Sequence, residues 1–272
     1  MEKLIEKYYR PRLPHIWCPG CGNGIVTSSI VKAIEKLGLD QDKTVIVSGI
    51  GCSSRASGYL NFDTVHSLHG RALPLATGIK LADPELNVIV ITGDGDGTAI
   101  GGNHFIHAAR RNINLTVILF NNNIYGMTGG QFSPLTPTDS KATTAPYGTL
   151  ERAFDITELA KAAGATYVAR GTAFHTKMLV DVIADGISHD GFSLVEAVTQ
   201  CPIYFGRQNK KGDASNMLKT QRDNAVTIEA ARKLTPEQLQ GKFTIGVLHK
   251  SEAPEYTKQY EGVIARAQKG AK

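Results

Sequence analysis

Segments of unbroken hydrophobicity alternate along this chain with segments of helical periodicity. The hydrophobic segments are rich in β-branched residues and occur at 44–50, 87–93, 115–121, 165–169 and 192–198. Because polar residues do not alternate with the apolar ones, each segment indicates a strand buried on both faces of a sheet. Helical patterns occur at about 22–37, 71–82, 101–111, 155–163 and 173–187. This alternation predicts an α/β fold with a doubly wound, mostly parallel sheet.

The hydrophobic pattern changes near residue 202. Residues 203–272 are more polar and carry helical patterns near 214–233 and 255–269. We therefore expect an α/β domain over residues 1–202, followed by a C-terminal extension over 203–272 that packs on the core or on a partner subunit. The segment 122–150 is rich in Gly, Pro, Ser and Thr and predicts a long loop. Loops of that length are usually either functional or disordered.

Composition and charge narrow the class of protein. The chain has 272 residues, of which 42% are hydrophobic, and a net charge of +5 that is spread along the sequence. A diffuse charge of this size does not indicate a nucleic-acid partner. No apolar run approaches the roughly 18 residues of a membrane span, and the N-terminus lacks the apolar centre of a signal peptide. We expect a cytoplasmic protein, in which the four cysteines are metal ligands or catalytic groups more often than disulfides.

Two motifs follow neighbouring strands at the edge where such sheets bind ligands. GDGDG occupies 93–97 and NNNIYG occupies 121–126. The glycines allow a phosphate to approach the backbone, and a helix start expected near Gly101 offers unpaired N–H groups. Asp94 and Asn122 supply the hard oxygen ligands that Mg²⁺ prefers to share with phosphate. A Gly-Asp-Gly turn alone is common after a strand, but the two motifs in this order are more specific.

The paired motifs resemble the thiamine diphosphate signature of the transketolase and pyruvate decarboxylase superfamily. The resemblance implies that the Asp94 and Asn122 side chains and the Ile124 carbonyl bind Mg²⁺. The contacts that it implies with the cofactor are Gly95, Asp96, Gly126 and Met127.

The four cysteines are Cys18 and Cys21 in CPGCG, Cys52 in GIGCSSR, and Cys201 in TQCP. Four thiolates can hold a zinc ion or a 4Fe–4S cluster, and the spacing alone does not choose between them. A structural zinc site usually shows two Cys-x-x-Cys pairs, whereas this chain has one. Four unrelated buried thiols are the remaining alternative.

A closer resemblance covers about residues 10–210. CPGCGNG, SGIGCSSR, HGRALPLATGIK, GDGDGTAIGGNHFIHAARRN, NNNIYGMTGGQ and the late Cys-Pro are similar to the β subunit of 2-oxoacid:ferredoxin oxidoreductases, and most similar to that of the 2-oxoglutarate enzymes. The resemblance implies a 4Fe–4S cluster on Cys18, Cys21, Cys52 and Cys201, close to the thiazolium ring. It also implies that residues beside the cluster contact the cofactor: Ile50, Gly51, Cys52, Ser53 and His69.

The family resemblance also implies an activity and partners. The enzyme would oxidatively decarboxylate a 2-oxoacid, form an acyl-CoA and reduce ferredoxin, with 2-oxoglutarate and succinyl-CoA as the expected pair. Thiamine enzymes usually carry the Glu that activates the cofactor on a second α/β domain, and this chain shows only one. We therefore expect an α subunit that supplies this Glu and the CoA site. Small ferredoxin-like and γ subunits are further candidates.

Substrate choice has one candidate residue, Arg55, three positions after Cys52. A guanidinium can hold the distal carboxylate of 2-oxoglutarate through two parallel N–H contacts, and pyruvate has no such group. Alternatively, Arg55 is an ordinary surface or ion-paired arginine. Met127 stands where pyruvate-specific relatives carry Asn, which argues against a dedicated pyruvate enzyme.

Three other functions remain open on the sequence. The same chemistry could act on pyruvate, branched-chain or aryl 2-oxoacids. The chain could belong to a non-redox thiamine diphosphate decarboxylase with a structural zinc site. It could also be an electron-transfer module with one cluster, although the Mg²⁺ motif argues against that.

Overall fold

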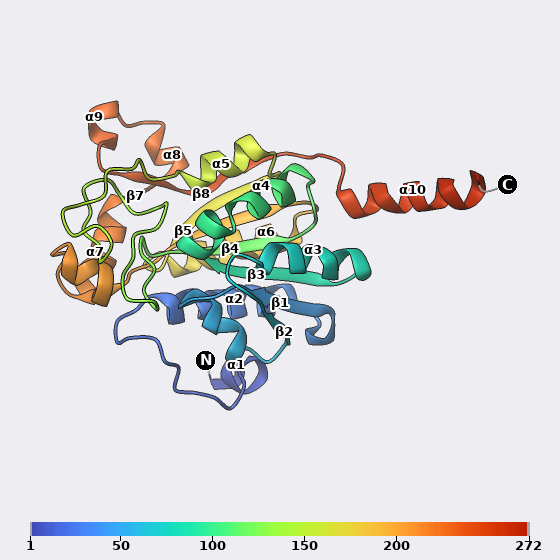
Figure 1. Ribbon diagram of the computed structural model, residues 1–272, viewed down its shortest axis with the longest axis horizontal. Coiled ribbons are helices and arrows are strands. Elements are labelled where there is room, and N and C mark those ends of the chain that lie inside the picture. The colour runs from blue at the N-terminus through green and yellow to red at the C-terminus, as the bar shows by residue number, and fades with distance from the viewer. Residues whose placement is uncertain (1, 271–272) are drawn as a thin grey trace.

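The computed structural model describes residues 2–270 and contains one large twisted sheet covered by helices (Figure 1). Its strand order is β2-β1-β3-β4-β6-β5-β8-β7. The six strands from β2 to β5 pair in parallel, and β8 joins β5 in the antiparallel direction. The strands are β1 (Thr44–Ser48), β2 (Asp63–His66), β3 (Asn87–Gly93), β4 (Thr116–Asn121), β5 (Tyr167–Thr172), β6 (Ser193–Val198), β7 (Ala225–Thr227) and β8 (Phe243–Lys250).

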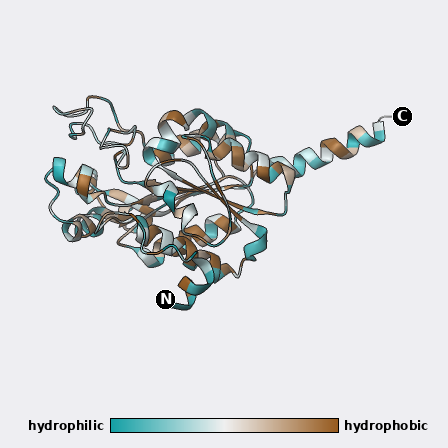
Figure 2. Cartoon of the chain, turned by 60° about the horizontal axis from the view of Figure 1, so that its bottom comes forward, coloured by the Kyte–Doolittle hydropathy of each residue, from teal (hydrophilic) through white to brown (hydrophobic). Residues whose placement is uncertain are grey.

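Helices cover both faces of the sheet, as a doubly wound fold requires. On one face, α2 (Asn23–Leu37) and α6 (Thr176–Ser188) pack against residues such as Ile89 and Ile91 of β3. On the other face, α3 (Ala72–Ala82), α4 (Gly102–Arg110) and α5 (Ile156–Ala163) pack against Val88 and Val90. Figure 2 shows the hydrophobic central strands between these layers. The predicted fold class is therefore confirmed.

The remaining helices lie at the two ends of the chain. They are α1 (Glu2–Tyr8), α7 (Ala214–Asn224), α8 (Ile228–Ala231), α9 (Pro236–Leu239) and α10 (Tyr256–Gly270). Short helical turns occur at Gln41–Lys43, Ser53–Gly58, Asp96–Ile100 and Pro202–Gly206. Helix α10 projects from the body of the molecule (Figure 1). None of the helices described between residues 2 and 270 is both long and apolar enough to cross a membrane.

The C-terminal segment differs from its predicted helices. The helix expected over 214–233 is wrong beyond Asn224, because β7 begins at Ala225 and only a short helix follows it. Strands β2, β7 and β8 were not predicted. All three lie at or near a sheet edge and are largely exposed or half-buried, so they lack the unbroken apolar run that marks a buried strand. Part of the segment 203–272 thus completes the central sheet.

Candidate active site

The loops after β1, β2, β3 and β4 surround an open pocket, or cavity, at the carboxyl edge of the sheet. This is the edge where open α/β sheets bind ligands. The cavity gathers the residues that the sequence singled out for the cofactor and for Mg²⁺. They are Ile50, Gly51, Cys52, Ser53, His69, Asp94, Gly95, Asp96, Asn122, Ile124, Gly126 and Met127.

The GDGDG motif is itself the first turn of a helical segment. The chain becomes helical at Asp94, directly after β3, and continues through a wide turn at Asp96–Ile100 into α4. The expectation of unpaired N–H groups near Gly101 is wrong, because the Gly101 N–H donates to the Asp96 carbonyl over 3.1 Å. The positive end of the helical segment therefore lies at Asp94 and Gly95, inside the cavity, where it favours an anion.

Asp94 is a buried carboxylate that lacks a cationic partner. Its side chain is 2% exposed, and burial raises the pKa of Asp94 to about 7. Ser133, from the long loop after β4, donates a hydrogen bond to Oδ2 of Asp94. Asp94 takes part in none of the ion pairs found among residues 2–270. A divalent cation at this carboxylate would supply the missing charge.

The Asn122–Ile124 turn presents the second and third predicted Mg²⁺ ligands. Asn123 adopts a left-handed conformation with φ of 63°, which reverses the chain within one residue. The Ile124 N–H donates to Asn122 Oδ1 over 3.2 Å, and the Asn123 N–H donates to Asn121 Oδ1 over 3.1 Å. The turn is thus held by two asparagine side chains, and both Asn122 and Ile124 line the cavity.

The Asp96 carboxylate ties together the loops that follow three strands. It accepts hydrogen bonds from the N–H groups of Ile50 (3.2 Å) and Gly70 (2.8 Å) and from the hydroxyl of Thr92 (2.7 Å). Its Oδ1 also lies 2.5 Å from His69 Nδ1. Asp96 therefore holds the walls of the cavity together, and both Asp96 and His69 lie where the sequence placed cofactor contacts.

Sequence reasoning missed Ser133 and Tyr125. Tyr125 lines the cavity and donates from its hydroxyl to the Gly95 carbonyl over 2.8 Å. A Cβ at position 95 would lie 2.2 Å from the Tyr125 ring, so only glycine fits there. Tyr125 could have been suspected because it lies within NNNIYG. Nothing in the local pattern distinguishes Ser133 from the other serines and threonines of the loop.

Two of the four cysteines meet at Gly126. A Cβ on Gly126 would lie 3.4 Å from Cys52 Sγ and 3.6 Å from Cys201 Sγ, so the absent side chain leaves space between the two sulfurs. The Cys18–Cys21 loop lies beside Cys201. The N–H of Gly22, the residue after Cys21, donates a hydrogen bond over 3.3 Å to the carbonyl of Gln200, the residue before Cys201. All four thiols are free.

The charge of each thiol affects the pKa of others in the group. Burial, followed by the charges of Cys201, Cys52 and Cys18, raises the pKa of Cys21 to about 12. Burial, followed by Cys201 and Cys18, raises the pKa of Cys52 to about 11. Within residues 2–270, no three His, Cys, Asp or Glu side chains converge closely enough to hold one metal ion.

Hydrogen-bond donors face this group of thiols. The N–H groups of Asn23 and Met127 donate to the thiols of Cys21 and Cys52, respectively. The Asn23 side-chain amide is fully buried on the sheet-facing stripe of α2, and neither of its polar atoms has a partner in the described part of the chain. A buried amide without a partner is costly unless a bound group satisfies it.

Arg55 does not line the cavity. Its guanidinium lies over the Tyr59 ring, 5.7 Å from the ring centroid, and also adjoins Gly58. Its Nε is buried and finds no hydrogen-bond partner between residues 2 and 270. The substrate role of Arg55 therefore stays a prediction that requires the side chain to turn from Tyr59.

The fold and the cavity define a class of protein. Residues 49–197 match the family of the thiamine pyrophosphate enzyme, C-terminal TPP binding domain. The match spans the strands and loops that build the cavity. This chain is thus a thiamine diphosphate-binding protein, as the GDGDG and NNNIYG motifs predicted.

Relatives along the whole chain identify the family more closely. The chain is 53% identical to the 2-oxoglutarate synthase subunit KorB of Methanothermobacter marburgensis, over 97% of this chain and 93% of that protein. It is 40% identical to the 2-oxoacid:ferredoxin oxidoreductase subunit beta of Saccharolobus solfataricus, over 87% and 77%. The chain belongs to the β-subunit family of 2-oxoacid:ferredoxin oxidoreductases, so it is an oxidoreductase subunit that works with partner subunits. The family predicted from the motifs is confirmed.

A solved structure supports the same assignment. The chain superposes with a TM-score of 0.87 and 35% identity on a 2-oxoglutarate:ferredoxin oxidoreductase from Magnetococcus marinus, over 97% of this chain and 90% of the other. That enzyme was solved with 2-oxoglutarate, coenzyme A and succinyl-CoA bound.

Proposed function

We propose that this chain is the cofactor-binding subunit of an enzyme that converts 2-oxoglutarate and CoA to succinyl-CoA and CO₂ and reduces ferredoxin. The observation that carries the proposal is the position of Cys52. It lines the cofactor cavity, and its sulfur faces Cys201 across Gly126. The loop that carries Cys52 would therefore contact both the cofactor, where the carbon bonds break and form, and a one-electron acceptor. The names of the similar proteins favour 2-oxoglutarate as the substrate.

We infer that Asp94, the Asn122 side chain and the Ile124 carbonyl hold Mg²⁺ against the diphosphate. The residues fit the ion, because Asp94 is buried without a cation and the other two oxygen donors lie on the same cavity. Mg²⁺ usually takes few protein ligands and shares phosphate oxygens, so a fourth protein ligand is not required. Thiamine diphosphate, when bound, supplies the chemistry that cleaves the bond between the 2-oxo carbon and the carboxylate.

We further infer that Cys18, Cys21, Cys52 and Cys201 hold a 4Fe–4S cluster. Buried thiols with raised pKa values become thiolates when a metal group supplies positive charge. A 4Fe–4S cluster takes four cysteines, each on a different iron. The N–H donors at Cys21 and Cys52 and the unpartnered amide of Asn23 also suit a sulfide-rich group.

We propose that an α subunit completes this site. No glutamate lines the cavity among the residues that the structure describes, so the activating Glu would come from the partner, together with the CoA site. Large apolar side chains are exposed at and near the cavity: Leu68 is 75% exposed, Ile100 51% and Met127 43%. A partner that covers them would also exclude water from the cofactor. Ferredoxin, and small ferredoxin-like or γ subunits, would then receive the electrons.

The test is reduction of ferredoxin or a viologen dye by the complex purified without oxygen, with a panel of 2-oxoacids. We expect CoA-dependent reduction with 2-oxoglutarate above that with pyruvate, branched-chain or aryl 2-oxoacids. We also expect roughly four irons for each copy of this chain, as one such cluster requires. Stoichiometric zinc without iron would overturn the cluster, and a clear preference for pyruvate would overturn the substrate.

A further inference from the structure

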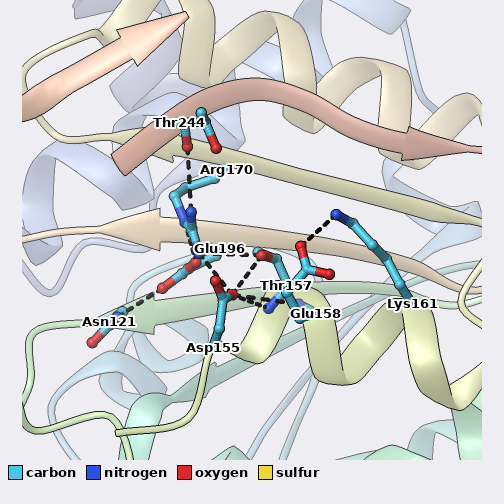
Figure 3. Close-up of polar contacts among 8 residues, drawn as sticks. All are labelled: Asn121, Asp155, Thr157, Glu158, Lys161, Arg170, Glu196 and Thr244. Carbon is cyan, nitrogen blue, oxygen red and sulfur yellow. Dashed lines mark hydrogen bonds and ion pairs between the residues drawn. The ribbon is translucent and has the colours of Figure 1, made fainter. Parts of the chain in front are cut away.

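A series of hydrogen bonds runs from the Asn122–Ile124 turn across β4, β6 and β5 to Asp155 at the start of α5 (Figure 3). It starts at Asn121, the last residue of β4 and the neighbour of Asn122. The Asn121 amide uses both of its ends: Oδ1 accepts the Asn123 N–H over 3.1 Å, and Nδ2 donates to Glu196 over 2.7 Å. The first of these bonds closes the left-handed turn at Asn123. The second holds the amide in the orientation that the first requires.

Glu196 accepts a hydrogen bond on each of its two oxygens. Oε1 receives the Asn121 amide, and Oε2 receives the Nε–H of Arg170 over 2.5 Å. The side chain of Glu196 is buried, with 3% of the residue exposed, and Arg170 is its neighbour on β5. Arg170 also donates to Asp155, the residue that caps α5, over 2.9 Å. The carboxylate is thus fixed by a cation that α5 holds in turn.

We propose that Glu196 is a positioning residue for the Asn122–Ile124 turn, and that it acts through Asn121. This inference rests on the proposed function, because it assumes that the turn carries Mg²⁺ ligands. An asparagine amide can present its oxygen to the Asn123 N–H only if its nitrogen points to an acceptor. Glu196 is that acceptor, and a carboxylate can accept at the Asn121 end and at the Arg170 end together.

Replacing Glu196 by glutamine cannot satisfy both ends. If the Gln oxygen meets Arg170, its amide N–H₂ faces the N–H₂ of Asn121, and two donors meet. Asn121 then gains by rotating its amide, which places its N–H₂ against the Asn123 N–H and removes the bond that closes the turn. If the Gln oxygen instead meets Asn121, its N–H₂ faces the Arg170 guanidinium. Either arrangement leaves a buried donor unpaired.

Moving the carboxylate to position 121 restores all the hydrogen bonds between the Asn123 N–H and Arg170. In the double variant Asn121→Asp/Glu196→Gln, the Gln oxygen accepts from Arg170 and the Gln amide donates to one oxygen of the new aspartate. The other oxygen of that aspartate accepts the Asn123 N–H. The net charge is unchanged, and every donor has an acceptor. The single variant Asn121→Asp would place two carboxylates against each other.

The experiment measures the affinity of the assembled complex for thiamine diphosphate with Mg²⁺, by calorimetric titration after the cofactor has been removed. We expect Glu196→Gln to weaken binding roughly tenfold or more, the size that follows from one unpaired buried donor. Asn121→Asp should weaken binding as well, and the double variant should return to within about threefold of the unaltered complex. Thermal unfolding of each variant is measured in parallel.

The matched control is Glu255→Gln. Glu255 is another buried carboxylate, 3% exposed, but it binds the N–H of Asn114, before the opposite end of β4. We expect this variant to lower the unfolding temperature without changing cofactor affinity. If Glu196→Gln does the same, or if the double variant binds no better than the two single variants, the positioning role is wrong. If the unaltered complex fails to bind the cofactor, the proposed function fails instead.

Discussion

Ser133 donates a hydrogen bond to Asp94 from a loop that begins after the next strand of the sheet. Asp94 comes at the end of β3, whereas Ser133 lies in the long segment after β4. Backbone N–H groups of Asp94, Gly95 and Asn122 also donate to this carboxylate, so the loop and the two cofactor motifs fix it together. A loop with no strand or helix of its own therefore orients the proposed Mg²⁺ ligand.

Asp94→Ala is expected to abolish Mg²⁺-dependent binding of thiamine diphosphate and to leave the fold intact. The substitution removes the only charged ligand, and it also removes a buried carboxylate that lacks a cation in the protein itself. Asn122→Ala should be milder, because it removes a neutral ligand. Calorimetric titration of the complex measures the affinity, and circular dichroism checks the fold. An unchanged affinity in Asp94→Ala would refute the Mg²⁺ assignment.

Ser133→Ala is expected to weaken the affinity for Mg²⁺ and thiamine diphosphate by about tenfold or more, the effect of losing one hydrogen bond to a carboxylate. The same titration measures it. Ser140→Ala is the control, since Ser140 lies in the same loop and its hydroxyl makes no hydrogen bond within the described part of the chain. Equal affinities in the two variants would mean that Ser133 does not orient Asp94.

Gly126→Ala is expected to prevent cluster incorporation. The new methyl group would stand 3.4 and 3.6 Å from the sulfurs of Cys52 and Cys201, in the space that the cluster needs. The backbone at this glycine does not require a positive φ, so the fold should tolerate alanine. Iron content and visible absorbance of the anaerobically purified complex measure the effect.

Gly102→Ala serves as the control for this experiment. Gly102 begins α4, and a Cβ there meets no atom within 4 Å. This variant should keep its full iron content. If Gly126→Ala keeps it too, the cluster does not lie between Cys52 and Cys201.

Arg55→Ala is expected to raise the KM for 2-oxoglutarate roughly 30-fold or more, with a much smaller change for 2-oxobutyrate and pyruvate. The expectation follows from the loss of a charged partner for the distal carboxylate. It requires that Arg55 leaves the Tyr59 ring when substrate binds. Initial rates over a range of each substrate decide the question. An equal loss for all substrates would assign Arg55 to packing against Tyr59.

The sequence by itself was enough to predict five of the six strands that lie between the sheet edges, the helices between them and the edge where the cofactor motifs meet. These features are local: an unbroken apolar run such as Val88–Ile91 indicates a buried strand wherever it occurs, and residues after parallel strands share one edge. Asp94 and Asn122 could be placed together for that reason alone. The family was predicted from the resemblance of these motifs, in this order, to those of known enzymes.

Only the tertiary structure decided which side chains meet. The approach of Cys52 and Cys201 at Gly126, the bond from Ser133 to Asp94 and the chain from Asn121 through Glu196 to Arg170 all join segments far apart in sequence. The antiparallel addition of β8 was equally hidden, since this half-buried strand, next to the edge strand β7, has no unbroken apolar run. Such contacts depend on strand register and on the paths of loops, which arise from packing of the whole chain and leave no local periodicity to recognise.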